Sequence, residues 1–279
     1  LVPCSDGAGV VEAVGAGVTR FAVGDRVMPN FAQGWLAGRE TREKMKTTLG
    51  GPLDGTLREL GVFSEEGLVA IPEHLTDEEA ATLPCAAVTA WNALAGKGSV
   101  RAGDTVVTLG TGGVSIFVLQ LARLFGARVI VTSSSNEKLA RAKELGAWHG
   151  INYLERPEWA DGVLEVTGGA GADHVVELGG AGTLGQSLKA VRPGGEISII
   201  GVLAGAVTEL NLTSVLMRGL RLQGVLVGSR EHFEDMNRAL GHHRLRPVLD
   251  RTFDFTDAPA AFRHLAGGRH FGKVVVCVS

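Results

Sequence analysis

Cysteine is scarce in this chain of 279 residues. The three cysteines, Cys4, Cys85 and Cys277, have no C-x-x-C spacing and no pairing pattern. A disulfide framework is therefore excluded, and we expect a reducing compartment, the cytoplasm. No apolar run is long enough to span a membrane, and no secretory signal is visible, so we expect no membrane partner.

The chain also lacks a large excess of charge of either sign. The 27 Lys and Arg residues against 30 Asp and Glu residues give a net charge of -3, which offers no reason to expect a nucleic-acid partner. None of the eight histidines has metal-like spacing to an acid or a cysteine. The chain does not begin with Met, and its opening LVPCSDGAGVV is typical of the middle of a fold, so we expect further residues upstream.

What the sequence does contain is a strand, a glycine turn and a helix in direct succession. Thr105 to Leu109 is a β-branched apolar run, and Gly110, Gly112 and Gly113 follow it at once. Apolar residues then recur at helical spacing from Val114 to Phe125, and a second apolar run, Arg128 to Val131, follows Gly126. This order is half of a dinucleotide-binding fold.

The turn has the pattern Gly110-x-Gly112-x-x-Ser115. Glycines allow a sharp turn and close approach of a pyrophosphate, which the helix N-terminus attracts. Ser115 replaces the usual third glycine and is small enough to fit. We therefore expect Gly110, Thr111, Gly112, Gly113, Val114 and Ser115 to contact a nucleotide cofactor. The alternative is a glycine turn in an α/β protein that binds no nucleotide.

The end of the second strand indicates which nucleotide. A cofactor with a free ribose 2′-OH needs an acid roughly 20 residues after the first glycine, and none lies near Val131 to Ser133. Ser133, Ser134 and Lys138 suit a 2′-phosphate instead, so the sequence favours NADP(H) over NAD(H). The alternative, compatible with this, is that the serines cap the next helix.

Strands and helices continue to alternate as far as residue 227, which predicts a doubly wound parallel sheet of α/β class. Ligands of such sheets lie at the carboxyl ends of the strands, which adds Gly179 and Gly201 to the candidate cofactor contacts. Short β-branched runs with glycine turns before Thr76 indicate a β-rich part, and the chain returns to strand character after Val248.

Several segments together resemble the medium-chain dehydrogenase/reductase superfamily, in particular its zinc-independent quinone-oxidoreductase-like and alcohol-dehydrogenase-like branch. They are SDGAGVVEAVGAGVTRFAVGDRV, ATLPCAAVTAWNAL, GDTVVTLGTGGVSIFVLQLAR, GARVIVTSSSNEKL, LGAWHGINY, ADHVVELGG and HFGKVVVCV. The resemblance implies a Rossmann domain (96–247) inserted in a partial GroES-like β-barrel domain (1–95 and 248–279). It also implies a homodimer and an N-terminal truncation.

The resemblance also implies roles for single residues. Lys138 and Tyr153 would contact the 2′-phosphate, and Thr89 would lie near the nicotinamide. Backbone contacts to the nicotinamide ribose and carboxamide would come from Gly201, Val202, Val225, Leu226 and Val227. Tyr153 is the only tyrosine, which excludes the Tyr-x-x-x-Lys arrangement of short-chain dehydrogenases. Packing within its strand is the alternative role for Tyr153.

Zinc-dependent relatives carry Gly-His-Glu where this chain has Cys4-Ser5-Asp6, and a serine is a poor substitute for a ligating histidine. Cys85 stands at another ligand position, and the third would lie upstream of Leu1. We therefore expect no catalytic zinc, with Cys85 a ligand only if the chain is a zinc alcohol dehydrogenase.

The leading hypothesis is an NADP(H)-preferring oxidoreductase that transfers hydride to or from a carbonyl, alcohol, enone or quinone without zinc. The alternatives are a zinc-dependent alcohol dehydrogenase and an NADP(H)-binding protein without turnover. The catalytic acid is not identified, and water or solvent-exposed hydroxyls could supply the proton. Ser5, Asp6 and Thr89 are the candidate catalytic residues, as candidates for the wall of the substrate cleft.

Overall fold

The computed structural model describes residues 1–278. Its internal contacts divide the chain into two compact units. Unit 1 comprises Leu1–Val88 and the segment from Val227 onward, and unit 2 comprises Thr89–Leu226. This division differs from the domain ranges expected from the sequence, mainly because residues 227–247 pack with unit 1. The two units are described separately below.

Unit 2 is built on a six-stranded sheet in which every neighbouring pair is parallel. The strand order is β6-β5-β4-β7-β8-β9, which is the doubly wound order 3-2-1-4-5-6. The strands are β4 (Thr105–Leu109), β5 (Arg128–Ser133), β6 (His149–Asn152), β7 (Ala172–Glu177), β8 (Val191–Ile199) and β9 (Arg221–Gly224). The predicted fold class is confirmed.

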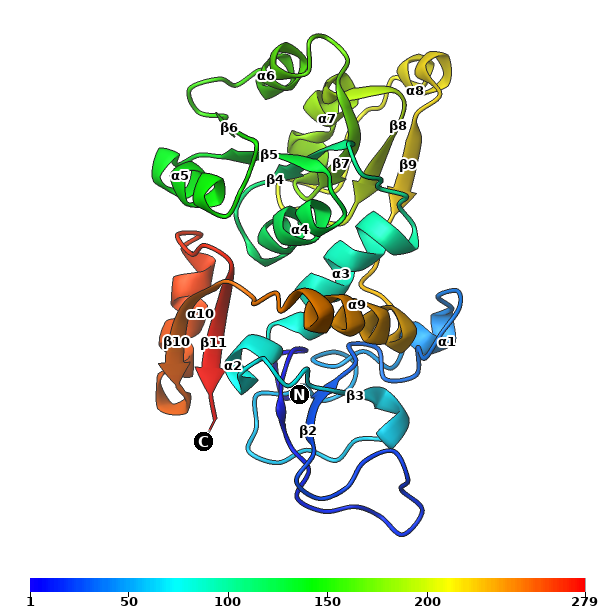
Figure 1. The fold of residues 1–279 in the computed structure, drawn as a ribbon, viewed down its shortest axis with the longest axis vertical. Coiled ribbons are helices and arrows are strands. Elements are labelled where there is room, and N and C mark those ends of the chain that lie inside the picture. The colour runs from blue at the N-terminus through cyan, green and yellow to red at the C-terminus, as the bar shows by residue number, and fades with distance from the viewer. Residues whose placement is uncertain (279) are drawn as a thin grey trace. The chain divides into compact units, whose positions relative to one another are not determined.

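Helices cover both faces of this sheet, as Figure 1 shows for the part of the chain between α3 and β9. All five residues of β4 are buried, as expected for a strand with helices on both faces. The helices of unit 2 are α3 (Val88–Trp91), α4 (Gly113–Leu124), α5 (Asn136–Glu144), α6 (Trp159–Val166), α7 (Leu184–Ala190) and α8 (Leu212–Arg218). The strand β8 begins at Val191 and includes Pro193, Gly194 and Gly195, although such a sequence is a turn signal.

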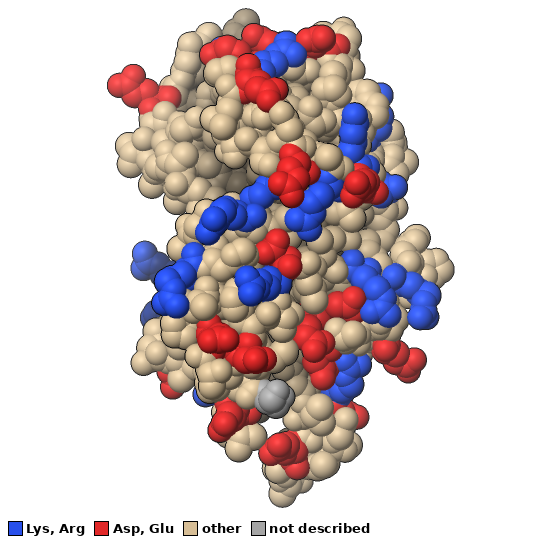
Figure 2. Space-filling view, turned by 90° about the vertical axis from the view of Figure 1, so that its left-hand side faces the viewer, with Lys and Arg blue, Asp and Glu red and all other residues tan. Residues whose placement is uncertain are grey.

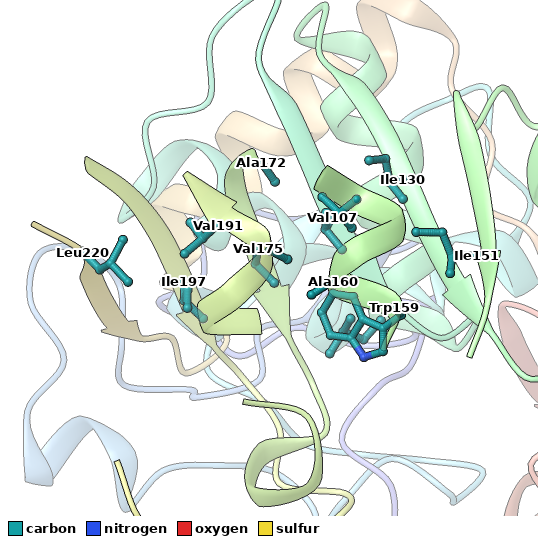
Figure 3. Close-up of a cluster of buried hydrophobic side chains, with 13 residues drawn as sticks. Val107, Ile130, Ile151, Trp159, Ala160, Ala172, Val175, Val191, Ile197 and Leu220 are labelled. Atoms are coloured by element: carbon teal, nitrogen blue, oxygen red, sulfur yellow. The ribbon is translucent and has the colours of Figure 1, made fainter. Parts of the chain in front are cut away.

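One face of the sheet forms a continuous apolar core. Figure 3 shows Val107, Ile130 and Val175 from neighbouring strands, with Trp159 of α6 lying against them. Because successive side chains of a strand point to opposite faces, these residues identify the face that α6 covers. Burial of such large apolar side chains is the main source of stability for the unit.

Unit 1 contains two small sheets. β1 (Gly9–Val10), β2 (Arg26–Pro29) and β3 (Leu68–Ala70) form an antiparallel sheet, and β10 (Leu249–Asp254) pairs in parallel with β11 (Lys273–Cys277). The helix between the last two strands is α10 (Ala258–Ala266), and two short helices are α1 (Arg42–Met45) and α2 (Asp77–Ala80). A π-helical turn at Leu83–Ala87 follows α2 and contains Pro84.

The helix α9 (Arg230–His243) was not expected from the sequence. Ser229 caps it by accepting from the His232 backbone N–H at 3.2 Å, and the His232 ring bonds back to the Ser229 N–H. Phe233, Met236 and Leu240 are buried at spacings of three and four residues. This helical periodicity could have been recognised in the sequence. In the structure α9 is part of unit 1 and not of unit 2.

Charges of both signs are interspersed on the surface. Figure 2 shows basic and acidic side chains side by side over the visible face. Opposite charges pair within each unit, as in Arg26–Asp77 at 2.6 Å and Lys189–Glu158 at 3.0 Å. Across residues 1–278, no helix combines the length and apolar character needed to cross a membrane.

Candidate functional site

The glycine turn after β4 has the geometry that phosphate binding requires. Gly110 has a φ of +77°, a conformation that residues with a Cβ rarely adopt, and its N–H donates to Thr132 O at 2.9 Å. Gly112 is the N-cap of α4, and the helix runs for 12 residues from there. Such a helix start offers free N–H groups and a positive dipole end to an anion.

Ser115 fits the position of the usual third glycine. Its side chain is buried, and its hydroxyl donates to Leu109 O at 2.6 Å. The bond ties the first turn of α4 to the last residue of β4, so helix and strand remain closely packed despite the extra side chain. The serine in place of the third glycine therefore does not separate the helix from the strand.

The end of β5 shows the helix capping that the sequence left as an alternative, and phosphate binding there stays a prediction. Ser135 caps α5 by accepting from the Lys138 N–H at 3.3 Å, so helix capping is real at that serine. Ser133 is buried, and its hydroxyl accepts from the Ser135 N–H at 3.2 Å. Ser134 is exposed, and Lys138 is half-buried. Of the serines, Ser134 is thus the more accessible to a ligand.

Tyr153 lies beside this strand end. Its N–H donates to Ser133 O at 3.0 Å, just after β6, and its side chain is 39% exposed. Core packing therefore does not explain this tyrosine. Ser134, Lys138 and Tyr153 supply hydroxyls and a cation at the carboxyl end of β5 and β6, the chemistry that a phosphate monoester takes.

A turn follows the carboxyl end of each of the strands β7 and β8, and the two turns are hydrogen-bonded to each other. We call residues 178–182 the β7 rim turn and residues 201–205 the β8 rim turn. Ala204 N donates to Gly179 O at 2.7 Å, and Ala181 N donates to Gly205 O at 2.8 Å. The candidates Gly179, Gly201 and Val202 therefore lie in one hydrogen-bonded structure, and the Val202 side chain is exposed.

The remaining cofactor candidates lie at the ends of elements. Val225 N donates to Ile199 O at 3.0 Å, which continues the β8–β9 pairing beyond β9, and Leu226 is half-exposed. Val227 has a φ of +41° and belongs to unit 1, while Thr89 is buried on α3 in unit 2.

Unit 1 holds a separate polar cluster around Asp6. Asp6 Oδ2 lies 2.7 Å from Lys273 Nζ, and the Ser5 hydroxyl donates to Asp6 Oδ1 at 3.4 Å. The two charged side chains are about four-fifths buried, with 21% exposed for Lys273 and 18% for Asp6. The sequence reasoning missed Lys273, because nothing in a local pattern links two positions 267 residues apart.

The charges of this cluster shift the protonation of its members. Burial acts to lower the pKa of Lys273, but the neighbouring Asp6 carboxylate outweighs it and raises the pKa. The pKa of the Cys4 thiol is raised as well, by burial first and by Asp6 second. At neutral pH Lys273 is therefore a charged ammonium and Cys4 a protonated thiol.

The backbone around Cys4 is held in an unusual conformation. Cys4 has a φ of +68°, and its carbonyl accepts from Thr56 N at 3.0 Å. A Cβ built on Gly55 would lie 1.9 Å from Cys4 O, so only glycine allows this approach. The Thr56 hydroxyl also donates to the carbonyl of Asp6. The segment that carries Ser5 and Asp6 is therefore pinned from two sides.

The same residues fit a catalytic zinc poorly. Ser5 offers a hydroxyl where a ligating imidazole would be needed, and Asp6 is paired with Lys273. Among residues 1–278, no three or more His, Cys, Asp and Glu side chains are grouped so that they could hold a metal ion. The absence of a catalytic zinc stays a prediction, and Cys85 would be a ligand only in a zinc-dependent alcohol dehydrogenase.

The sheet order and the glycine turn define unit 2 as a Rossmann dinucleotide-binding unit. Comparison with protein families agrees: residues 113–241 match the zinc-binding dehydrogenase family and residues 1–73 match the alcohol dehydrogenase GroES-like domain. A zinc-type alcohol dehydrogenase-like protein of Schizosaccharomyces pombe is 45% identical over 99% of this chain and 82% of its own length.

Two further proteins extend this similarity. A quinone oxidoreductase of Pseudomonas aeruginosa is 33% identical over 98% of this chain and 80% of its own length. A crystal structure of a provisionally assigned alcohol dehydrogenase from Sinorhizobium meliloti 1021 superimposes with a TM-score of 0.94 at 51% identity, covering 99% of this chain and 82% of that one. The chain therefore belongs to the medium-chain dehydrogenase/reductase superfamily, as an oxidoreductase of the alcohol dehydrogenase and quinone oxidoreductase type.

Proposed function

We propose that this protein is an NADP(H)-preferring oxidoreductase that transfers hydride between the nicotinamide and a small-molecule carbonyl, alcohol, enone or quinone without a catalytic metal. The observation that carries the proposal is the glycine turn from Gly110 to Ser115, placed between β4 and the free N-terminus of α4. Membership of a family of alcohol dehydrogenases and quinone oxidoreductases supports the reaction class.

Each part of the cofactor has candidate partners in unit 2. The pyrophosphate would be held by the backbone N–H groups at the start of α4, and the 2′-phosphate by Ser134, Lys138 and Tyr153. The nicotinamide half would lie at the rim turns, near Gly179 and Gly201, because ligands of doubly wound sheets bind at the carboxyl ends of the strands. When bound, the nicotinamide supplies or accepts the hydride.

The preference for NADP(H) rests on the end of β5. The strand ends in Thr132 and Ser133 with no acid to accept from a ribose 2′-OH, and Lys138 follows in the first turn of α5. A carboxylate there would repel a 2′-phosphate, whereas a cation attracts it.

The substrate side depends on polar groups rather than on a metal. Ser5, Asp6 and Thr89 are the candidate catalytic residues, and the Lys273 ammonium adds a positive charge beside Asp6. In such a site the rate enhancement would come from proximity and from fixed dipoles. A zinc-dependent alcohol dehydrogenase is the second candidate, favoured by the family description and by Cys85.

The deciding experiment is a titration with NADPH and with NADH, followed by quenching of tryptophan fluorescence, with zinc measured on the same sample. Tighter NADPH binding without zinc supports the proposal, and stoichiometric zinc supports the alcohol dehydrogenase alternative. A screen of quinones, enones and aldehydes with NADPH follows. Tight NADPH binding with no turnover of any of these would contradict the enzyme and support a protein that only binds the cofactor.

We also propose that the protein is a cytoplasmic homodimer that pairs through the edge of the sheet. β9 is the edge strand, and α8 exposes apolar side chains next to it in sequence, with Leu216 78% and Met217 77% exposed. Sedimentation of the wild type should give twice the chain mass, and Met217→Glu should shift it toward the monomer. A wild type that sediments as a monomer rules the dimer out.

A further inference from the structure

Glu177 is an acid that the proposed chemistry does not use. It is the last residue of β7 and is 0% exposed. Its Oε1 accepts from Gly179 N at 2.8 Å and from Gly180 N at 3.0 Å, and the hydroxyls of Thr183 and Ser187 also donate to the carboxylate. In the described chain no Lys or Arg forms an ion pair with it, so hydrogen bonds alone compensate its burial.

The backbone of Glu177 makes contacts on the other side. Its carbonyl accepts from Ile200 N at 2.9 Å and from Gly201 N at 3.3 Å. The carboxylate therefore holds the β7 rim turn, while the carbonyl holds the start of the β8 rim turn. One residue thus bonds to both of the turns in which Gly179 and Gly201 lie.

The two rim turns leave little space for another conformation. Gly180 has a φ of +77°, and a Cβ built on it would lie 2.4 Å from Gly205 O. A Cβ on Gly201 would lie 2.5 Å from Leu178 O. The shape of the turns thus depends on close backbone contact, and Glu177 accepts from the buried N–H of Gly180 and the half-buried N–H of Gly179.

We propose that Glu177 is a positioning residue that shapes the rim turns for the nicotinamide half of the cofactor. This inference rests on the proposed function, because it takes the rim of the sheet as the cofactor site. Glu177 is fully buried and does not contact the cofactor itself. It acts through the backbone of Gly179, Gly180 and Gly201.

The test compares the two halves of the cofactor. 2′,5′-ADP probes only the adenosine half, at the glycine turn and Lys138, whereas NADPH also occupies the rim. Glu177→Met removes all four bonds to the carboxylate, and unpaired buried donors should weaken NADPH binding by about tenfold. Binding of 2′,5′-ADP should change by less than about twofold, since the glycine turn is untouched. Glu177→Gln, which keeps the shape and one acceptor, should fall between wild type and Glu177→Met.

Glu196 provides a matched control. It is a second buried acid of the same sheet, on β8, and it pairs with Arg221 rather than with a rim turn. Glu196→Gln should lower thermal stability and leave the ratio of NADPH to 2′,5′-ADP affinity unchanged. If Glu177→Met does not fold, Thr183→Val removes a single donor to the carboxylate and should weaken NADPH alone, by about threefold.

The outcomes separate the role of Glu177 from the function itself. Equal loss of NADPH and 2′,5′-ADP in the Glu177 variants, or no loss of either, overturns the positioning role and leaves the proposed function standing. A wild type that binds neither ligand overturns the cofactor site, and this role with it. If the wild type binds NADH rather than NADPH, the variants are titrated with NADH and AMP instead. A selective loss of NADH affinity relative to AMP affinity then supports the positioning role, and an equal loss overturns it.

Discussion

The glycine turn of unit 2 and the Asp6 cluster of unit 1 are both candidate functional regions, but the first consists of backbone groups and the second of charged side chains. The turn uses backbone groups of one short segment, with Gly110 at a φ of +77° and Gly112 at the start of α4. The cluster uses charged side chains from the two ends of the chain, Asp6 and Lys273, 2.7 Å apart.

This difference predicts which substitutions each region tolerates. A binding site made of backbone should be sensitive to an added Cβ and nearly indifferent to distant charges. A cluster made of a largely buried ion pair should be sensitive to the loss of either charge, because the remaining charge is then buried alone. The comparison is confirmed if an added Cβ lowers cofactor affinity at the turn and loss of a charge lowers stability in the cluster. It is contradicted if loss of the cluster's charge lowers cofactor affinity.

The largest effect on cofactor affinity is expected at the glycine turn. Gly110→Val places a β-branched residue at a φ of +77°, where side chains are strained, and its methyl groups would face the approaching pyrophosphate. NADPH and NADH affinity should both fall, by about 100-fold, a loss of about 2.7 kcal/mol of binding free energy. Fluorescence titration of both cofactors measures it.

Gly103→Val is the matched control, since Gly103 has a φ of +92° and lies in the turn before β4, at the opposite end of the same strand. A Cβ would meet open space at either glycine. The control should show the stability cost of the strained backbone without the loss of affinity. If both variants lose affinity equally, strain in the strand rather than the phosphate contact would be the cause.

The next effect is expected in the cluster of unit 1. Lys273→Met leaves the Asp6 carboxylate largely buried without its cation, which should lower the free energy of unfolding by about 3 kcal/mol. NADPH affinity should stay within about twofold, because the glycine turn does not depend on this charge. Urea unfolding monitored by tryptophan fluorescence gives the stability.

Lys273→Arg keeps the charge and should retain most of that stability. The raised pKa of Lys273 adds stability that is fully present below pH 10.5 and is lost as pH rises through the folded pKa, so assays near pH 7 see the whole effect. Should Lys273→Met abolish NADPH binding while remaining folded, the contrast between the two regions would be wrong.

The same contrast explains what could be predicted from the sequence. The turn from Gly110 to Ser115, the helix after it and the missing acid at the end of β5 are local patterns, and the alternation of strands and helices predicted the doubly wound parallel sheet. Lys273 was missed because its partner is at the other end of the chain, and α9 was missed although Phe233, Met236 and Leu240 carry a helical period. The burial of Ser133 beside an exposed Ser134 could not be predicted, because it depends on tertiary packing; the contact of Ser133 with the cofactor stays a prediction.

A smaller effect should appear in unit 2 as a dependence on pH. His174 on β7 is buried and its ring shares a hydrogen bond of 2.9 Å with the Ser198 hydroxyl. Burial first and Arg221 second, opposed by Asp173, lower the pKa of His174 to about 4. The unfolded chain takes up this proton near pH 6.5 and the folded chain near pH 4. Stability should therefore fall between these two values as pH falls, by up to about 3 kcal/mol.

His174→Gln tests this, since an amide can bond to Ser198 but does not titrate. Unfolding free energies at pH 7 and at pH 4.5 should differ less in the variant than in the wild type, by about 2 kcal/mol. Glu196 and Arg192 on the neighbouring strand β8 are present in the wild type and in the variant, so their effects on the pH dependence of stability cancel when the two are compared. Identical pH profiles would show that His174 is not held neutral. A neutral histidine in unit 2 and a charged lysine in unit 1 would extend the contrast to buried titratable groups.

The smallest effect is expected at Lys138, where the cofactor site, otherwise made of backbone groups, is expected to use the charge of a side chain. Lys138→Ala should weaken NADPH binding by about tenfold and leave NADH binding unchanged, because only NADPH carries the 2′-phosphate. Lys143→Ala, on the exposed surface of the same helix, controls for the general loss of one positive charge. Equal weakening of both cofactors by Lys138→Ala would contradict a phosphate contact and favour a structural role in α5. Selective weakening, together with an unaffected Lys143→Ala, would mean that the backbone provides affinity for any dinucleotide, while a single side chain at the end of β5 selects between them.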